Sequence, residues 1–106
     1  MQVRPADAGE LDHLARLWHD VWHESHARFA PPELIRLRTL ASFRDRLEAA
    51  LPDVYVAGPV GAPLGLCVLR DEELYQLFVA LEAHGSGVAA ALITDAEARL
   101  DRKSVV

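Results

Sequence analysis

Large apolar residues recur every three or four positions near the start of the chain, at Leu11, Leu14, Trp18, Val21 and Trp22. Residues at this spacing share one face of an α-helix, so the pattern predicts a helix over about residues 8 to 27 with a buried apolar face. Before it, residues 2 to 5 (QVRP) fit a short strand that Pro5 ends, and Asp7 can cap the helix with a side-chain oxygen.

A second helical stretch follows the paired prolines at residues 31 and 32, which end the first helix. It opens at Glu33 and runs to about residue 51, with an interruption expected near residues 39 to 42. Its apolar positions are Ile35, Leu40, Phe43, Leu47 and Leu51. The first half of the chain is therefore expected to be mainly helical.

From Val54 the pattern changes to short runs rich in strand-forming residues: VYVAG, LGLCVLR and ELYQLFV, separated by GPVGAP and by Asp71-Glu72. These runs predict three strands in antiparallel succession. The middle one, at residues 64 to 70, is nearly all apolar, as expected when both faces of a sheet are covered.

After the strands comes ALEAHGSG, and then VAAALITDAEARL, whose Ala and Leu content and spacing near 3.6 residues predict a helix. The expected fold class is α/β (α+β), a mixed and mainly antiparallel sheet with helices on both faces. We assign residues 1–106 to a single domain, with N-terminal helices over 8–51, strands over 54–79, and a loop and helix over 80–101.

Length, composition and charge limit the number of domains, the classes of partner and the location of the protein. With 106 residues, 51% of them hydrophobic, the chain can bury one core but not two. A formal net charge of -5 gives no basic field for nucleic acid or an anionic membrane. No signal peptide or span of about 20 apolar residues is visible, so a soluble, cytoplasmic protein is expected. The single cysteine, Cys67, excludes an intrachain disulfide and is expected to be a small buried residue.

The junction between the last strand and the last helix is the segment with the clearest chemistry. A glycine-containing loop at a helix start gathers unpaired backbone N–H groups where the helix dipole favours negative charge. Gly85 and Gly87 would let a phosphate approach the backbone, and Ser86 adds a hydroxyl donor. The loop is equally compatible with glycines that serve only a turn or close helix packing.

LFVALEAHGSGVAAALI resembles the central motif of the GNAT superfamily of N-acetyltransferases, a strand L-x-V followed by Arg/Gln-x-x-Gly-x-Gly/Ala. The matching loop positions are His84, Gly87 and Ala89, with His84 where Arg or Gln is usual. The resemblance, which covers roughly residues 1 to 100, implies acetyl-coenzyme A as co-substrate and no metal. It implies pyrophosphate contacts from the loop and contacts of the pantetheine arm with the strand, through Leu77, Phe78, Val79, His84, Gly85, Ser86, Gly87, Val88 and Ala89.

The resemblance also implies a reaction, transfer of an acetyl group to a primary amine by direct attack. Glu73 is the best match for the family's strand carboxylate that deprotonates the amine, although Glu72 and Glu73 also fit a solvated turn. The acceptor, a small molecule or a peptide, would contact side chains on the first helices and on the strand: Trp22, His23, His26, Phe29 and Tyr75. His19, His23 and His26 share one side of the first helix, but a solvated or acceptor-lining face is favoured over a metal site.

Three alternatives stay open. The family continues after this helix with a further strand, so we expect a C-terminally truncated domain whose open sheet edge could pair with a second copy in a homodimer. Gly85, Gly87 and Ala90 also fit a dinucleotide-binding fingerprint, although no later acidic strand follows. A noncatalytic module that binds acyl-coenzyme A or associates with itself is the third.

Overall fold

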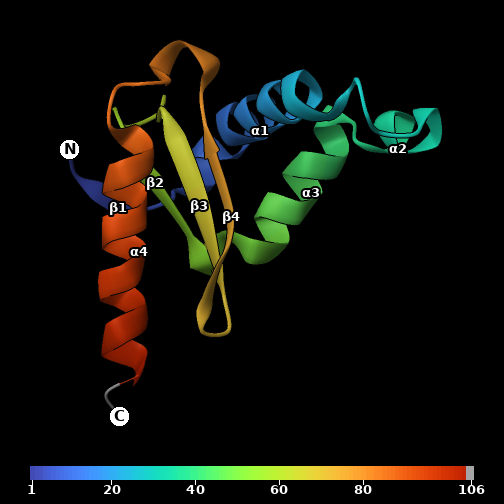
Figure 1. The fold of residues 1–106 in the computed structure, drawn as a ribbon. Coiled ribbons are helices and arrows are strands. Elements are labelled where there is room, and N and C mark those ends of the chain that lie inside the picture. Colours follow the sequence, from blue (N-terminus) through green and yellow to red (C-terminus); the bar gives the residue numbers. More distant parts are fainter. Residues whose placement is uncertain (105–106) are drawn as a thin grey trace.

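The computed structural model describes residues 1–104 as a sheet with helices on both sides (Figure 1). The predicted domain also includes residues 105 and 106, which lie outside the described part. In chain order the strands and α-helices are β1 (Val3–Pro5), α1 (Leu11–His26), α2 (Pro32–Leu37), α3 (Leu40–Ala50), β2 (Val54–Ala57), β3 (Gly65–Arg70), β4 (Glu73–Val79) and α4 (Val88–Ser104). None of the helices in this part of the chain is long and apolar enough to cross a membrane.

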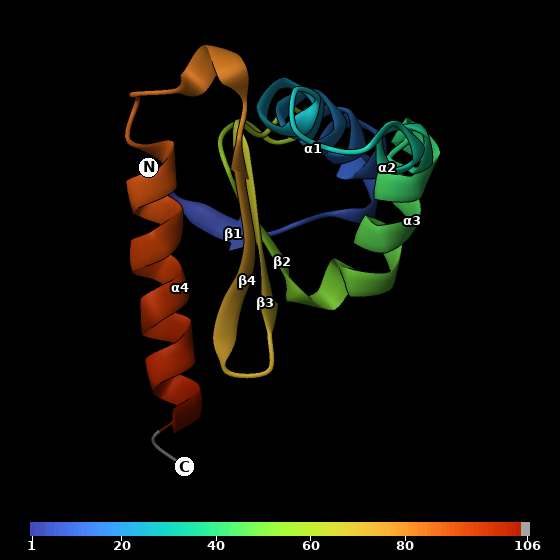
Figure 2. The same cartoon turned by 45° about the vertical axis from the view of Figure 1, so that its right-hand side comes forward.

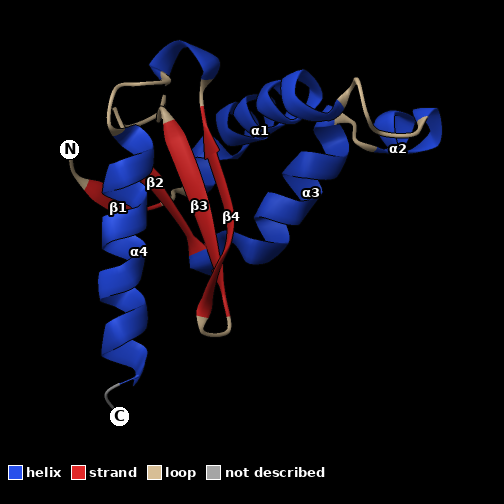
Figure 3. Ribbon diagram, in the orientation of Figure 1, coloured by secondary structure: helices blue, strands red, loops and turns tan. Residues whose placement is uncertain are grey.

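The four strands follow one another in the sheet in the order β1-β2-β3-β4, and each neighbouring pair is antiparallel (Figure 3). The predicted antiparallel succession of the last three strands is therefore confirmed. A dinucleotide-binding βαβ unit requires two parallel strands, and the described sheet contains none. The described sheet therefore gives no support to the alternative interpretation of the glycine loop as a dinucleotide fingerprint.

Helices cover both faces of the sheet, as the apolar run of β3 predicts. Figure 2 shows α4 alone on one side and α1 with α3 on the other. The predicted apolar stripe of α1 is buried: Leu14 and Trp18 are at most 3% exposed. Phe43 and Leu47 of α3 are fully buried against it. The two helical faces and the sheet thus share one continuous apolar core.

The helix boundaries follow local capping groups. Asp7 accepts a hydrogen bond from the backbone N–H of Gly9 and caps a short 3-10 turn, Ala8–Glu10, that leads into α1. The break between α2 and α3 falls at residues 38 and 39, at the edge of the predicted interval. There Thr39 Oγ1 accepts a hydrogen bond from the Ser42 N–H at 3.1 Å, which caps α3.

A buried carboxylate ties β1, the start of α1 and the β2–β3 loop together. Glu10 is 2% exposed and forms a two-pronged ion pair with Arg4, at 2.9 and 2.7 Å. Its oxygens also accept the backbone N–H groups of Asp7 and Gly61, both at 2.9 Å. The hydrogen bonds from Arg4 lower the pKa of Glu10 to about 2, against the opposing effect of burial.

Candidate active site

A cavity of about 510 Å³ lies where the end of β4 meets the start of α4. Its walls come from three elements: Val21 and Ser25 of α1, residues 77–79 of β4, and the loop into α4. The structure therefore brings together the two segments predicted to hold the arm and the pyrophosphate. Of the predicted loop residues, only Ser86 does not line the cavity.

The loop has a backbone shape that explains its glycines. Gly85 and Gly87 have φ angles of +81° and +89°, in the left-handed region that side chains disfavour. A Cβ atom at either position would meet nothing within 4 Å, so the requirement is conformational and not steric. The space beside both glycines is open to a ligand.

The same loop leaves a group of backbone donors without partners. Within the described chain, the N–H groups of Gly85, Gly87, Val88, Ala89 and Ala90 donate no backbone hydrogen bond, and the first helical bond is that from Ala91 to the Gly87 carbonyl, at 3.0 Å. These donors lie at the N-terminus of a long helix, where the dipole favours negative charge. An anion held there would meet several N–H groups at once.

The two polar side chains of the loop are already engaged. The Ser86 hydroxyl donates to the Ala83 carbonyl, so its proton is not directed at the cavity. His84 Nε2–H donates to the Val79 carbonyl at 3.1 Å, and both residues line the same cavity. His84 thus links the loop to the last residue of β4.

A close contact fixes the loop against the sheet. Gly65, the first residue of β3, faces α4 so closely that an added Cβ would lie 2.6 Å from Val88 Cγ1 and 3.0 Å from Leu92 Cδ1. Val88 and Leu92 are at most 1% exposed. The N-terminus of α4 is therefore held in place by packing on a position that only glycine can occupy without displacement.

Strand β4 offers its backbone to the cavity. Ala80 N–H donates to the Leu64 carbonyl at 2.8 Å, and the alternation of an antiparallel ladder then directs the backbone groups of Phe78 toward β3. Those of Leu77 and Val79 point the other way, to the edge that has no neighbour in the described sheet. An extended amide-containing ligand could pair with this edge.

A β-bulge interrupts β4 between the cavity and the β3–β4 turn. Val68 pairs with Gln76 but Leu69 pairs with Leu74, which leaves Tyr75 as the extra residue. Tyr75 is 39% exposed, and its ring lies under the guanidinium of Arg70, with Cζ 3.9 Å from the ring centroid. The bulge therefore directs Tyr75 toward basic side chains.

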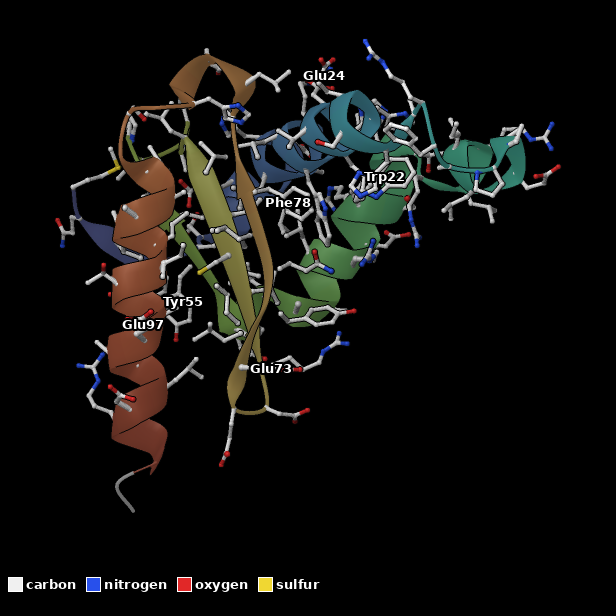
Figure 4. The ribbon with its side chains drawn as sticks, in the orientation of Figure 1. Trp22, Glu24, Tyr55, Glu73, Phe78 and Glu97 are labelled. Carbon is white, nitrogen blue, oxygen red and sulfur yellow. The ribbon has the colours of Figure 1, made fainter. Side chains whose placement is uncertain are left out.

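Glu73 is exposed and lies beside the β3–β4 turn, at the end of the sheet away from the glycine loop (Figure 4). It stands six residues before Val79, which corresponds to about 20 Å along an extended strand. A ligand with its phosphates at the loop would have to extend along β4 to present a reactive group near this carboxylate.

The predicted acceptor residues on α1 are only partly accessible. Trp22, which Figure 4 labels on α1, is 8% exposed. Its ring stacks on that of His26, with centroids 4.9 Å apart. His23 Nε2–H donates to the Arg38 carbonyl at 2.7 Å, which ties α1 to the α2–α3 junction. Phe29, in contrast, is 86% exposed and lies after the end of α1. Trp22 and His26 thus lie together on α1, while Phe29 lies beyond its end.

Sequence reasoning missed a set of arginines on the α1/α3 side of the sheet. Arg46 of α3 lies over the Trp18 ring, with Cζ 4.5 Å from its centroid, and shares a cavity of about 260 Å³ with Arg70. Neither arginine stands in a recognisable motif. The only signal was the basic end of an otherwise apolar strand, at Arg70. Among the described residues, no group of three or more His, Cys, Asp or Glu side chains could hold a metal ion.

Comparison with solved structures assigns the fold. The PaiA N-acetyltransferase from Thermoplasma acidophilum, in complex with coenzyme A, is 17% identical with a TM-score of 0.70, over 97% of this chain and 73% of that one. A GCN5-related N-acetyltransferase from Rhodopseudomonas palustris is 20% identical with a TM-score of 0.76, over 97% and 67%. A ribosomal-protein-alanine N-acetyltransferase from Brucella melitensis is 19% identical with a TM-score of 0.71, over 97% and 68%.

The chain therefore has the GNAT fold, and the fold class expected from the sequence is confirmed. It spans about two thirds to three quarters of the length of these three N-acetyltransferases. No family model and no curated protein matches the sequence.

Proposed function

We propose that the protein is an N-acetyltransferase that moves the acetyl group of acetyl-coenzyme A to a primary amine by direct attack. One observation carries the proposal: the cavity between β4 and α4 joins unpaired loop amides to an unpaired strand edge. A diphosphate with an amide-rich arm matches both halves of this surface.

The loop residues would hold the anionic end of the co-substrate. The N–H groups of Gly87, Val88 and Ala89 would donate to the pyrophosphate, and His84 would lie beside it. The backbone groups of Leu77 and the N–H of Val79 would pair with the pantetheine arm along the strand edge, whereas the Val79 carbonyl already accepts from His84. When bound, acetyl-coenzyme A supplies an activated thioester carbonyl.

Glu73 would accept the proton of the attacking amine, since a protonated amine has no lone pair for the thioester. Cys67 fits poorly as a covalent intermediate. It is fully buried in β3, and burial, reinforced by the charge of Asp95, raises the pKa of its thiol to about 11. Direct transfer therefore agrees better with this chain than an acyl-cysteine route.

A calorimetric titration with acetyl-coenzyme A tests the site, with NAD as a control ligand. In Gly87→Ala, a side chain at a φ angle of +89° costs roughly 1–2 kcal/mol unless the loop moves, so the affinity for acetyl-coenzyme A should fall about tenfold. Gly61→Ala is a matched control. Its φ is +85°, its Cβ also meets nothing within 4 Å, and it lies in the β2–β3 loop.

The Gly61→Ala variant should lose comparable stability and bind acetyl-coenzyme A like the unaltered protein. A folded protein that releases no heat with acetyl-coenzyme A would contradict the proposed function. Saturable binding without amine-dependent release of coenzyme A would instead select the noncatalytic acyl-coenzyme A module.

A further inference from the structure

Basic side chains gather on one side of this acidic chain without acidic partners. The net charge is -5, yet Arg38, Arg46 and Arg70 take part in none of the ion pairs within residues 1–104. Arg44, only two residues before Arg46, pairs with Asp12 at 2.7 Å and also with Glu48. The lack of ion pairs at Arg46 and Arg70 in this part of the chain is therefore a local feature of one surface, although Asp53 lines the cavity that they share.

Arg46 is held in place by aromatic rings. Its Cζ lies 4.5 Å from the Trp18 centroid and 5.9 Å from that of Phe43, so the guanidinium packs on the apolar core and is half-buried. Burial lowers the pKa of Arg46, and the positive charges of Arg38 and Arg70 lower it further, whereas Tyr75 raises it. Like charges around a half-buried cation would be relieved by a bound anion.

Arg70 of β3 lines the same cavity as Arg46, from the side of the sheet. Its position in β3 pairs with Glu73 of β4, but no ion pair joins the two side chains in the described structure. Arg70 instead stacks on the half-exposed ring of Tyr75 at the bulge. The cavity of about 260 Å³ that Arg46 and Arg70 share also has Asp53 on its wall, so two positive charges face one negative charge.

We propose that Arg46 and Arg70 bind a carboxylate of the acceptor, so that the substrate class is primary amines that also carry a carboxylate. The inference rests on the proposed acetyl transfer. Guanidinium groups match a carboxylate in geometry and charge. Because Glu73 stands opposite Arg70 across the β3–β4 pair, an amine a few bonds from that carboxylate would reach the proposed base.

A binding measurement tests the arginines without turnover. Trp18 lies against Arg46, so an occupant that contacts Arg46 should change the fluorescence of Trp18, against the constant background of Trp22. The probes are two matched pairs that differ in the carboxylate: 4-aminobutanoate with butylamine, and lysine with pentane-1,5-diamine. Titrations are made with and without saturating coenzyme A. The carboxylated member of at least one pair should give a saturable change that its partner does not give.

Matched variants assign the effect to the cavity. Arg70→Gln removes one charge-assisted contact at an exposed position, and the apparent Kd for the carboxylated amine should rise roughly tenfold or more. Arg46→Lys keeps the charge but loses the planar stack, and should also weaken binding. Arg44→Gln removes the same charge from a position of α3 only two residues away and should leave the Kd within about twofold of the unaltered value.

Equal binding of both members of each pair, binding of neither, or an equal effect of Arg70→Gln and Arg44→Gln would overturn the proposal. Failure of the proposed function is a separate result. If acetyl-coenzyme A releases no heat while the carboxylated amine still binds through Arg70, the carboxylate site stands and the acetyl transfer falls. If acetyl-coenzyme A is turned over with amines regardless of their carboxylate, the acetyl transfer stands and the carboxylate site falls.

Discussion

At the scale of single residues, two kinds of charge serve different purposes in this chain. Glu10 is buried with every oxygen hydrogen-bonded, and it fixes the start of α1 to β1 and to the β2–β3 loop. Arg46 and Arg70 are held by rings and have no carboxylate partner in the described residues. Glu10, whose charge is fully hydrogen-bonded, stabilises the fold. Arg46 and Arg70 have no ion-pair partner in that part of the chain, and they are the residues proposed to bind a ligand carboxylate.

Replacing Glu10 with Gln should lower the free energy of unfolding by about 2 kcal/mol, because Arg4 and two backbone N–H groups lose a charged acceptor. Urea denaturation at neutral pH measures the change. Glu48→Gln is the control, since Glu48 is 63% exposed and its pair with Arg44 should contribute at most about 0.5 kcal/mol.

The ion pair between Glu10 and Arg4 also makes the free energy of unfolding depend on pH. The pKa of this carboxyl lies at about 2 in the folded protein, below its ordinary value of 4.5, so its contribution is complete above about pH 4.5. The contribution is lost as pH falls from there toward 2. The stability difference between the unaltered protein and Glu10→Gln should therefore shrink in that range. A difference that is constant from pH 7 to pH 2.5 would argue against a charged Glu10.

At the scale of elements, the contact between β3 and α4 positions the loop. Gly65→Ala would place a Cβ 2.6 Å from Val88 Cγ1, and the buried helix end cannot yield without moving the loop amides. Stability should fall by about 1–3 kcal/mol, and the affinity for acetyl-coenzyme A should fall with it. Thermal denaturation and calorimetry measure the two effects.

The double variant Gly65→Ala with Val88→Ala is the informative control, because it removes the group that the new methyl meets. It should be less damaging than the sum of the single changes, which a double-mutant cycle reports as a favourable coupling. Strict additivity would show that the close approach of α4 to Gly65 does not position the loop.

At the scale of the whole molecule, the sequence was most informative about elements that have a local pattern, such as apolar spacing, an apolar run or paired glycines. The α1 stripe, the apolar β3 and the glycine loop all predicted elements that the structure contains. The arrangement of the arginines could not be predicted in this way. Arg46 meets Trp18 and Arg70 meets Tyr75 only because α3 packs on α1 and because β4 bulges at Tyr75. Neither event has a signature along the chain.

The roles of the loop side chains were equally hidden from the sequence. Ser86 and His84 were both expected to face the ligand, yet their hydrogen bonds go to the Ala83 and Val79 carbonyls. Short-range bonds of this kind depend on the left-handed turns at Gly85 and Gly87, which a sequence pattern does not specify. The assignment of these residues to the cofactor stays a prediction.

The unpaired edge of β4 has a consequence for the exchange of amide hydrogens with solvent. The Leu77 and Val79 amides face away from β3, so in the unliganded protein they should exchange within seconds, while the Phe78 amide, directed at β3, is protected. Acetyl-coenzyme A that pairs with this edge should slow the exchange of Leu77 and Val79 and leave Phe78 almost unchanged. Deuterium labelling would then detect the bound ligand as slowed exchange at alternate residues of β4.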